Sequence, residues 1–457
     1  MSSSLKTDLI RLLGDQGVID QPEQCVGYAG DYSGLAPVVP PLVLCPQDTN
    51  EASELVRYLY QVGQPMTLRG AGSGKAGGCI PSEGSVVIST HRMADKPQVA
   101  KQDLTVCAAA GTLAAQLDEA ASEASLFYPP DPNSLAISSI GGNIATNAGG
   151  PRAVKYGLTG HYLLGLTMVG ARGDVITAGA GTIKCVAGSN LQGLMLGSEG
   201  TFGLITNVTM RLIARPAVIQ TALVTFTSSA AAVAAVGRLF QTGVMPRCAE
   251  LLDELSCETI TAQYPAALPS ACRAALILET DGNEEQAMDD LSSLAAACEG
   301  EGMGDVYLAQ TSGDKERIWK PRRNLSIALG QRRKLKVSED IAVPRGSLSQ
   351  TLTALRQASQ KTPFELATYG HAGDGNLHVN ILFDDEGQRS DVIDLQDEIF
   401  RIAIAMGGTI TGEHGVGLAK RHALPWELGE ARMALERSLK SAMDPSRLFN
   451  PHKVLEP

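Results

Sequence analysis

The sequence predicts an α+β protein of two domains, and two observations lead to that prediction. The chain has 457 residues, which is long for a single core and suggests two domains of about 200 residues each. Short apolar, β-branched runs alternate along it with segments of helical periodicity. Neither an all-helical nor an all-β protein is therefore expected.

The first 215 residues are expected to form one domain, which ends near Pro216. Its clearest helix is 50–63, where Leu55, Val56 and Leu59 share one face and acidic residues fill the first turn. The segment 1–17 reads as a short amphipathic helix without the layout of a signal peptide. Strands are expected at 41–47, 64–70 and 84–90, as a hairpin over 165–179, and as a long strand over 203–216.

Residues 216–457 are expected to form the second domain, an antiparallel sheet backed by helices. The pattern that predicts it alternates strands with helices of 10 to 16 residues. A further helix is expected at 391–407. The strands are expected at 219–227, 247–252, 274–280 and 304–310, and the helices between them at 228–241, 253–262 and 284–299.

Composition excludes several classes of protein. The net charge of −11 argues against a nucleic-acid partner, and an aromatic content of 4% argues against base-stacking surfaces. The nine cysteines contain no C-x-x-C pair, so zinc ribbons and iron–sulfur clusters are not expected. No run approaches 18 apolar residues, so no transmembrane segment is expected. We expect a cytoplasmic protein, at most peripheral to the inner face of the membrane.

A glycine-rich loop, "RGAGSGKAGG" (69–78), resembles two phosphate-binding motifs but fits neither. Lys75 stands where a Rossmann fingerprint needs its third glycine, and Ala76 where a Walker loop needs Ser or Thr. Alternating glycines still permit successive N–H groups to point inward and hold a pyrophosphate. A flexible turn would explain the loop equally well. Two more blocks rich in small residues, 129–157 and 194–206, favour a ligand-binding surface.

A histidine loop, "YGHAGDGNLHVN" (369–380), indicates a metal site. His371 and His378 flank a tight turn in which Asp374 is expected to act only as a turn former. Two imidazoles usually need a carboxylate to complete a metal site. The segment "TGEHGVG" supplies Glu413 and His414 between glycines.

Together these blocks resemble the flavin-binding domain of the vanillyl-alcohol oxidase (PCMH-type) family, and the second half resembles its FAD-linked oxidase C-terminal cap. The motifs are "PVVPPLVLCPQDTNEASELV", "LRGAGSGKAGG", "PPDPNSLAISSIGGNIATNAGG" and "GSEGTFGLIT". The resemblance implies an FAD-binding domain over 1–215 and a cap over 216–457, with the tail from about 411 returning to the first domain. The implied FAD-binding residues are Arg69, Gly70, Ala71, Gly72, Ser73, Gly74, Lys75, Pro130, Asp131, Ser138, Gly141, Gly142, Asn147, Gly149, Gly150, Glu199, Ile205 and Asn450. No histidine occurs between His91 and His161, so we expect FAD without a covalent bond.

The resemblance also implies the chemistry of the cap. Matching positions in bacterial D-lactate dehydrogenases, glycolate oxidase catalytic subunits and D-2-hydroxyglutarate dehydrogenases place a divalent metal (Zn, Mn or Fe) on His371, His378 and Glu413, with His414 as general base. A metal lowers the pKa of a bound hydroxyl, and histidine titrates near neutral pH. Arg322 is expected to clamp the substrate carboxylate. Ser326 lies one helical turn further on, and Asn380 shares a strand face with His378, so both are expected to act on the substrate as catalytic residues.

The substrate is expected to be a small D-2-hydroxy acid, lactate or glycolate. Relatives acting on 2-hydroxyglutarate have a lysine where this chain has Ser338, and Lys336 lies one pair further back. A hydroxyglutarate-type enzyme is the first alternative, and an inactive flavin-binding scaffold subunit is the second. Electrons are expected to pass to a quinone, an electron-transfer flavoprotein or an Fe–S subunit, and the protein to be a homodimer or part of a hetero-complex.

Overall fold

The computed structural model describes residues 3–455, and backbone contacts divide the chain into two compact units. The first unit comprises Met1–Gly149, Leu158–Arg215 and Glu413–Pro457. The second comprises Gly150–Gly157 and Pro216–Gly412.

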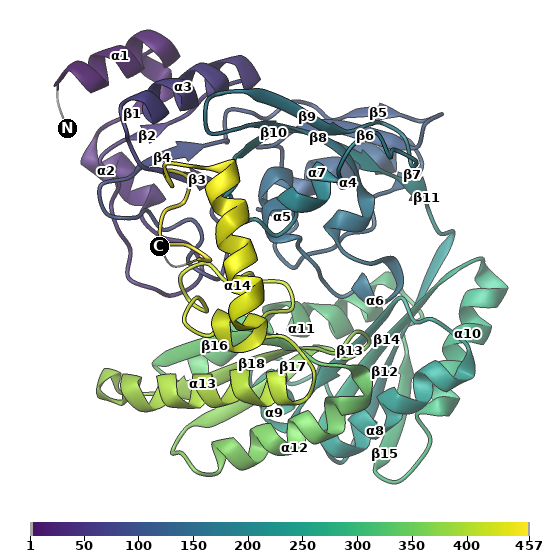
Figure 1. Ribbon diagram of the computed structural model, residues 1–457. Coiled ribbons are helices and arrows are strands. Elements are labelled where there is room, and N and C mark those ends of the chain that lie inside the picture. Colours follow the sequence, from purple (N-terminus) through teal and green to yellow (C-terminus); the bar gives the residue numbers. More distant parts are fainter. Residues whose placement is uncertain (1–2, 456–457) are drawn as a thin grey trace. The chain divides into compact units, whose positions relative to one another are not determined.

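The first unit contains two main sheets (Figure 1). One is four-stranded with order β1-β2-β4-β3, and its last three strands run parallel. The other is five-stranded and antiparallel with order β5-β6-β10-β8-β9. The strands of the first unit are β1 (Val18–Ile19), β2 (Val43–Leu44), β3 (Met66–Arg69), β4 (Val86–Ser89), β5 (Gln98–Ala100), β6 (Thr105–Ala109), β7 (Leu126–Phe127), β8 (Leu163–Val169), β9 (Val175–Gly179), β10 (Leu204–Arg211) and β11 (Ile213–Ala214). The helices of the first unit are α1 (Ser3–Leu13), α2 (Pro22–Cys25), α3 (Thr49–Gln61), α4 (Ala114–Glu123), α5 (Ile140–Thr146), α7 (Leu191–Met195) and α14 (Leu424–Met443).

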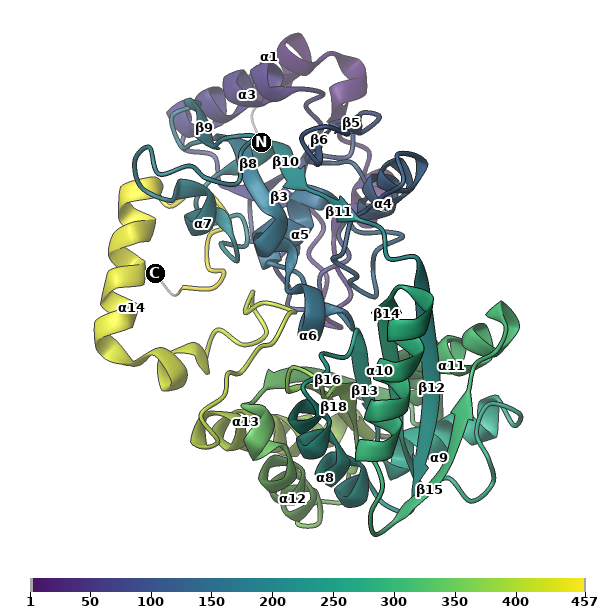
Figure 2. The same cartoon turned by 90° about the vertical axis from the view of Figure 1, so that its right-hand side faces the viewer.

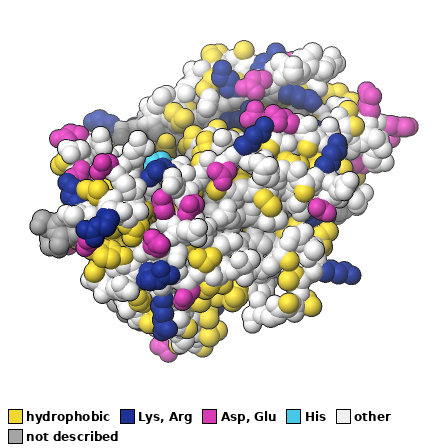
Figure 3. Space-filling model, turned by 90° about the horizontal axis from the view of Figure 1, so that it is seen from above, with side chains coloured by type: hydrophobic (Ala, Val, Ile, Leu, Met, Phe, Trp, Pro, Cys, Tyr) yellow, Lys and Arg dark blue, Asp and Glu magenta, His cyan; other side chains and the backbone are white. Residues whose placement is uncertain are grey.

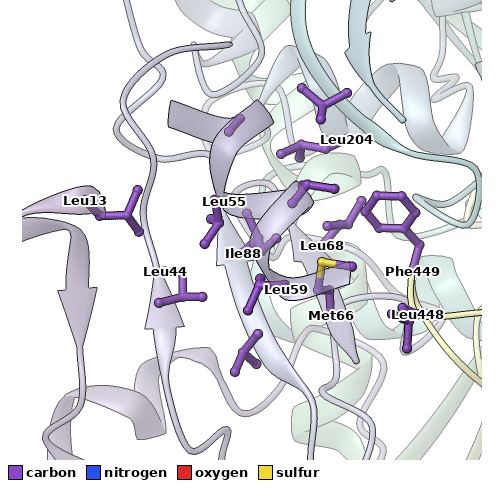
Figure 4. Packing of buried hydrophobic residues seen from close by; sticks show 14 of the residues in the cluster. Leu13, Leu44, Leu55, Leu59, Met66, Leu68, Ile88, Leu204, Leu448 and Phe449 are labelled. Carbon is purple, nitrogen blue, oxygen red and sulfur yellow. The ribbon is translucent and has the colours of Figure 1, made fainter. Parts of the chain in front are cut away.

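The core of the first unit lies between α3 and the parallel strands, and the C-terminal tail enters it. Figure 4 shows Leu55 and Leu59 of α3 packed toward Met66, with Phe449 of the tail beside them. The Met66 N–H donates to the Leu448 carbonyl oxygen over 2.8 Å, so the tail extends the edge of β3. Burying the tail's aromatic side chain in this core fixes the segments that precede and follow it.

The second unit is a seven-stranded antiparallel sheet with order β15-β12-β14-β13-β17-β18-β16. Its strands are β12 (Val218–Phe226), β13 (Cys248–Leu252), β14 (Ala274–Gly282), β15 (Met303–Leu308), β16 (Leu335–Ala342), β17 (Glu365–His371) and β18 (Asn376–Phe383). Its helices are α6 (Ala153–Tyr156), α8 (Ser229–Leu239), α9 (Glu254–Gln263), α10 (Glu284–Ala297), α11 (Ser312–Arg332), α12 (Leu348–Ser359) and α13 (Arg389–Ala405).

Helices cover both faces of this sheet (Figure 2). Helices α9 and α11 pack on one face, where Trp319 and Leu325 join Ile277 and Leu382 in an apolar cluster. Helices α8, α10, α12 and α13 pack on the other. Because successive residues of a strand point to opposite faces, every second residue of β13, β17 and β18 faces α9 and α11.

The predicted order of strands and helices over 219–310 is confirmed, and each boundary lies within about two residues of its prediction. The helix predicted at 50–63 is α3, and the Asp48 carboxylate caps it by accepting from the Asn50 and Glu51 N–H groups. Helix α14 was not predicted. Only Leu424, Met433 and Lys440 of α14 are buried, and Gly429 breaks its course, so it has no clear apolar stripe.

Two findings bear on membrane and nucleic-acid partners: the composition of the helices and the distribution of charge on the surface. Among residues 3–455, no helix combines the length and the apolar composition needed to cross a membrane. On the face in Figure 3, acidic and basic side chains are interspersed rather than gathered into one basic patch.

Candidate active site

The first unit holds a cavity, partly open to solvent, where the glycine-rich blocks meet. Of the predicted FAD-binding residues it is lined by Arg69, Gly70, Gly74, Gly141, Gly142, Glu199 and Ile205, and His414 lines it too. Ala76, Cys79, Thr90, Ala110, Ala145 and Thr146 also line it and were not predicted. The predicted residues Ala71, Gly72, Ser73, Lys75, Pro130, Asp131, Ser138, Asn147, Gly149 and Asn450 are not among its lining, and Gly150 belongs to the second unit.

Two glycines let the walls of this cavity pack closely together. A Cβ on Gly70 would lie 2.3 Å from the Ser139 hydroxyl oxygen, and a Cβ on Gly141 would lie 2.9 Å from the Ala110 carbonyl oxygen. Any side chain at either position would therefore push two walls apart. Close approach of backbone to ligand is a common use of glycine.

Two buried polar side chains near the start of α5 have atoms without a hydrogen-bond partner in the described residues. The Ser138 hydroxyl and the Asn143 side-chain amide nitrogen are buried and have no hydrogen-bond partner within the described chain. Leaving such groups unpaired costs about 1–3 kcal/mol each. The adjoining Gly141 and Gly142 line the cavity.

Arg69 and Asn147 mainly hold loops. One Arg69 Nη1–H donates to the Gly30 carbonyl oxygen over 2.8 Å. Gly72 closes over the same guanidinium, since a Cβ there would lie 2.1 Å from Nη2. The Asn147 Oδ1 accepts from the Gly160 N–H over 2.9 Å. Both side chains shape the loops around the cavity.

Glu199 and Asn450 form a hydrogen-bond network that holds the segment carrying His414. The two Glu199 carboxylate oxygens accept from the Val416 and Gly417 N–H groups over 2.7 and 2.9 Å. Asn450 donates its side-chain N–H to the Glu199 carbonyl oxygen over 2.5 Å and accepts the Leu68 N–H over 2.7 Å. Burial raises the pKa of Glu199 to about 7, although the two N–H bonds oppose that shift. This network fixes the position of His414 in the lining of the cavity.

The second unit brings the two loop histidines together. They lie on neighbouring strands, His371 at the end of β17 and His378 in β18, with ring centroids 5.3 Å apart and rings nearly perpendicular. Both are buried. Gly375 makes the tight turn between them possible, with φ at +88° and no room for a Cβ beside the Val343 carbonyl oxygen. Asp374 accepts from the Asn376 N–H over 3.2 Å, as a turn former does.

A buried glutamate, Glu250 of β13, contacts His371 and was not predicted. Its Oε1 lies 2.5 Å from His371 Nδ1, and its Oε2 accepts from Arg322 Nη2 over 2.5 Å. Burial alone would raise the pKa of Glu250, but His371 and Arg322 outweigh it and lower that pKa to about 2. One signal was available: Glu250 is the only charged residue in the apolar strand "CAELL".

Arg322 of α11 is buried on the same sheet face. Its guanidinium lies 4.7 Å from the centroid of the Tyr369 ring. Besides the bond to Glu250 it has a buried Nε–H without a hydrogen-bond partner in the described structure. The neighbouring arginines are engaged elsewhere: Arg332 and Arg333 both donate to Glu365 near the surface.

Ser326 and Asn380, both predicted to act on the substrate, have partners within the second unit. Lys336 donates to the Ser326 carbonyl oxygen over 2.6 Å and to its hydroxyl over 2.8 Å. Asn380 accepts from the Ser338 hydroxyl over 2.9 Å and donates to the His378 carbonyl oxygen over 3.3 Å. These contacts give both side chains a part in holding α11 and β16 to the sheet.

Glu413 opens the last segment of the first unit, directly after Gly412, the last residue of the second. The Gly412 N–H donates to Asp340 over 2.8 Å, and Asp340 is the cross-strand partner of His378. A Cβ on Gly149 would lie 3.0 Å from a Glu413 carboxylate oxygen.

Comparison with known families agrees with both halves of this description. A model of the FAD binding domain matches residues 40–179, and a model of the C-terminal domain of FAD linked oxidases matches residues 215–454. The chain belongs to the FAD-linked oxidases. As an FAD-linked oxidoreductase it is an enzyme.

This FAD-linked oxidase is similar along its whole length to proteins with named activities. It is 33% identical to the glycolate oxidase subunit GlcD of Bacillus subtilis (strain 168), over 99% of this chain and 97% of that protein. It is 32% identical to the D-lactate dehydrogenase of Anaerostipes hadrus, over 89% and 87% of the two chains. A D-lactate dehydrogenase of Archaeoglobus fulgidus is also 32% identical, over 91% of each.

Solved structures share the fold of this FAD-linked oxidase. p-Cresol methylhydroxylase with substrate bound superposes with a TM-score of 0.81 at 16% identity, covering 100% of this chain and 98% of the other. Alkyldihydroxyacetonephosphate synthase gives a TM-score of 0.75 at 19% identity, covering 99% and 85%. At these identities the likeness establishes the fold alone, which confirms the predicted PCMH-type class.

Proposed function

We propose that this FAD-linked oxidase is a dehydrogenase that oxidises a small D-2-hydroxy acid, D-lactate or glycolate, to the 2-oxo acid. The observation that carries the proposal is the buried chain His371–Glu250–Arg322 on one sheet face of the second unit. In this chain Glu250 connects His371, a proposed metal ligand, to Arg322, the proposed carboxylate-binding group. A 2-hydroxy acid presents a hydroxyl to the first and a carboxylate to the second. The activities named for the relatives support the same substrate class.

We propose that FAD is held without a covalent bond by the loop around Gly70 and Gly74, the start of α5 and the segment from Glu199 to Ile205. When bound, FAD supplies the hydride acceptor for the reaction. No histidine lies between His91 and His161 to form a bond to the flavin. Acid precipitation should therefore leave the yellow colour in the supernatant, and colour retained in the pellet would contradict this part of the proposal.

We propose His371, His378 and Glu413 as ligands of a divalent cation, Zn, Mn or Fe. The donor set fits, because two imidazoles and a carboxylate suit all three ions. The contact between Glu250 and His371 Nδ1 also leaves Nε2 as the nitrogen to face a cation, which is usual for a metal-bound histidine. Such a cation would lower the pKa of the substrate hydroxyl.

The remaining roles fall to His414 and Arg322. His414 lines the cavity proposed for FAD, so its imidazole suits the acceptance of the hydroxyl proton. Arg322 has a buried Nε–H left for the substrate carboxylate. Asn380 and Ser326 are proposed to hold the strands and α11 in place, since both already have hydrogen-bond partners within the chain.

The same sheet face supports a monocarboxylate. Ser338 is bonded to Asn380, and Lys336 donates to Ser326, so both side chains already have partners within the chain. Because a second carboxylate would need a cation to pair with, we favour D-lactate or glycolate over D-2-hydroxyglutarate.

The electron acceptor is proposed to be external: a quinone, an electron-transfer flavoprotein or an Fe–S subunit. The name of the Bacillus subtilis relative, a glycolate oxidase subunit, favours a hetero-complex.

Anaerobic mixing of the purified holoprotein with single hydroxy acids tests the substrate class. D-Lactate or glycolate should bleach the flavin absorbance within seconds, and L-lactate should not. Bleaching by D-2-hydroxyglutarate alone would replace the proposed substrate with a dicarboxylate. A flavin that none of these acids reduces would favour the scaffold alternative.

A further inference from the structure

Glu250 is a carboxylate placed where burial is most costly. It lies in the middle of β13, an inner strand of the seven-stranded sheet, and its side chain is 0% exposed. Ala249 and Leu251 on either side of it are equally buried. An ionised group in such surroundings is stable only when it is paired and hydrogen-bonded.

The two oxygens of Glu250 are divided between two different functional groups. Oε1 contacts the ring nitrogen Nδ1 of His371, and Oε2 accepts from Arg322 Nη2, each over 2.5 Å. Arg322 could have formed a two-pronged ion pair with both oxygens, which is the stronger arrangement for this pair alone. Sharing the carboxylate therefore gives up some ion-pair strength to hold the histidine.

A second buried glutamate on the same sheet face has different partners. Glu279 of β14 accepts from Thr221 over 2.9 Å and from Trp319 over 2.7 Å. Its other oxygen lies 3.3 Å from Arg247 Nε. Glu279 thus serves as a structural acceptor for α11 and β12, and neither Thr221, Trp319 nor Arg247 belongs to the proposed catalytic set.

We propose that Glu250 is a positioning residue that couples the cation-binding half of the site to the carboxylate-binding half. Oε1 holds His371 with its proton on Nδ1, so that Nε2 keeps a lone pair for the cation. Oε2 fixes the Arg322 guanidinium and balances its charge, so that Nε–H remains for the substrate. The inference rests on the proposed function.

This coupling makes a prediction that simple loss of structure would not. Glutamine has a single amide oxygen, so in Glu250→Gln that oxygen cannot accept from both Arg322 and His371 Nδ1. If it stays with the charged Arg322, the amide NH2 faces His371 Nδ1 and no longer holds a proton there, so metal affinity should fall. Arg322 is no longer balanced by a neighbouring negative charge, so an anion at Arg322 should bind more tightly. The two affinities therefore move in opposite directions. Glu250→Asp keeps the charge but is one methylene too short to reach both partners, so it should weaken the metal and leave the anion unchanged.

The test measures Zn²⁺ affinity by chelator competition, and oxalate affinity by calorimetry on metal-free protein, in FAD-loaded wild type and variants. For Glu250→Gln we expect Zn²⁺ affinity to fall about 10–100-fold and oxalate affinity to rise on the order of tenfold. Glu279→Gln is the matched control, because it makes the same change at a buried glutamate one strand away. It should alter neither affinity more than about twofold.

Several results would overturn the inference. One is a Glu250→Gln protein that keeps wild-type affinity for both probes, and another is one that loses affinity for both. A wild-type protein that takes up neither Zn²⁺ nor Mn²⁺ nor Fe²⁺ would instead remove the cation from the proposed function. The coupling would then be decided by oxalate alone, with tighter binding in Glu250→Gln supporting it and unchanged binding rejecting it.

Discussion

Replacing His378 with alanine is expected to abolish reduction of the flavin by substrate and leave FAD bound. His378 lies in β18 of the second unit, 5.3 Å from His371 between ring centroids. The residues proposed to hold FAD belong to the first unit. Loss of one metal ligand should remove several kcal/mol of charge stabilisation, which slows bleaching by about 10³-fold or more.

Stopped-flow measurement of flavin bleaching, with FAD content read from the same sample, checks this expectation. His422→Ala is the control, because His422 is exposed and its ring packs edge-on against Trp426 at 5.6 Å. That variant should bleach at the wild-type rate. Unchanged bleaching in His378→Ala would remove the cation from the mechanism.

Replacing Arg322 with methionine is expected to damage both catalysis and folding. The substrate carboxylate loses a buried charged donor, a loss of about 2–5 kcal/mol, so kcat/KM should fall about 10²–10³-fold. The buried Glu250 loses its cationic partner, and removing one member of a buried pair destabilises a protein by about 3–5 kcal/mol. Because Arg322 is 7% exposed, solvent screening offsets little of this loss.

Denaturant unfolding and steady-state kinetics on the folded fraction separate the two effects. Arg323→Met is the matched control on the same helix. Arg323 is exposed and pairs with Glu316 over 3.2 Å at the surface, and such pairs contribute about 0–1 kcal/mol. An Arg322→Met protein with wild-type kcat/KM would mean that another group binds the carboxylate.

Local pattern was sufficient for α3 and for the elements over 219–310. The apolar stripe and acidic first turn of 50–63 predict α3, and the strand–helix alternation after Pro216 predicts the antiparallel sheet. These patterns depend on residues a few positions apart, whose spacing is the same in every fold that contains them. Helix α14 lacks such a pattern, because it buries little apolar surface and Gly429 interrupts it.

The residues of the candidate site also fall into two groups: those that the sequence indicates and those that only the tertiary structure brings together. His371 and His378 are close because one tight turn joins their strands, which the sequence itself indicates. Glu250 could not be assigned, because its partners lie 72 and 121 residues away. They become neighbours only when β13 pairs with β17 and α11 packs on that face.

The sequence by itself indicated the family, the order of the elements over 219–310 and the side chains proposed to carry the chemistry. Only the tertiary structure decided that Glu250 Oε1 contacts His371 Nδ1 and that Glu250 Oε2 accepts from Arg322 Nη2. Strand order and helix packing are set by the burial of the whole core, and no local spacing records them. For that reason Asn380 and Ser326, assigned to the substrate from sequence, have partners within the chain, whereas Glu250, which no motif marks, joins the two halves of the proposed site.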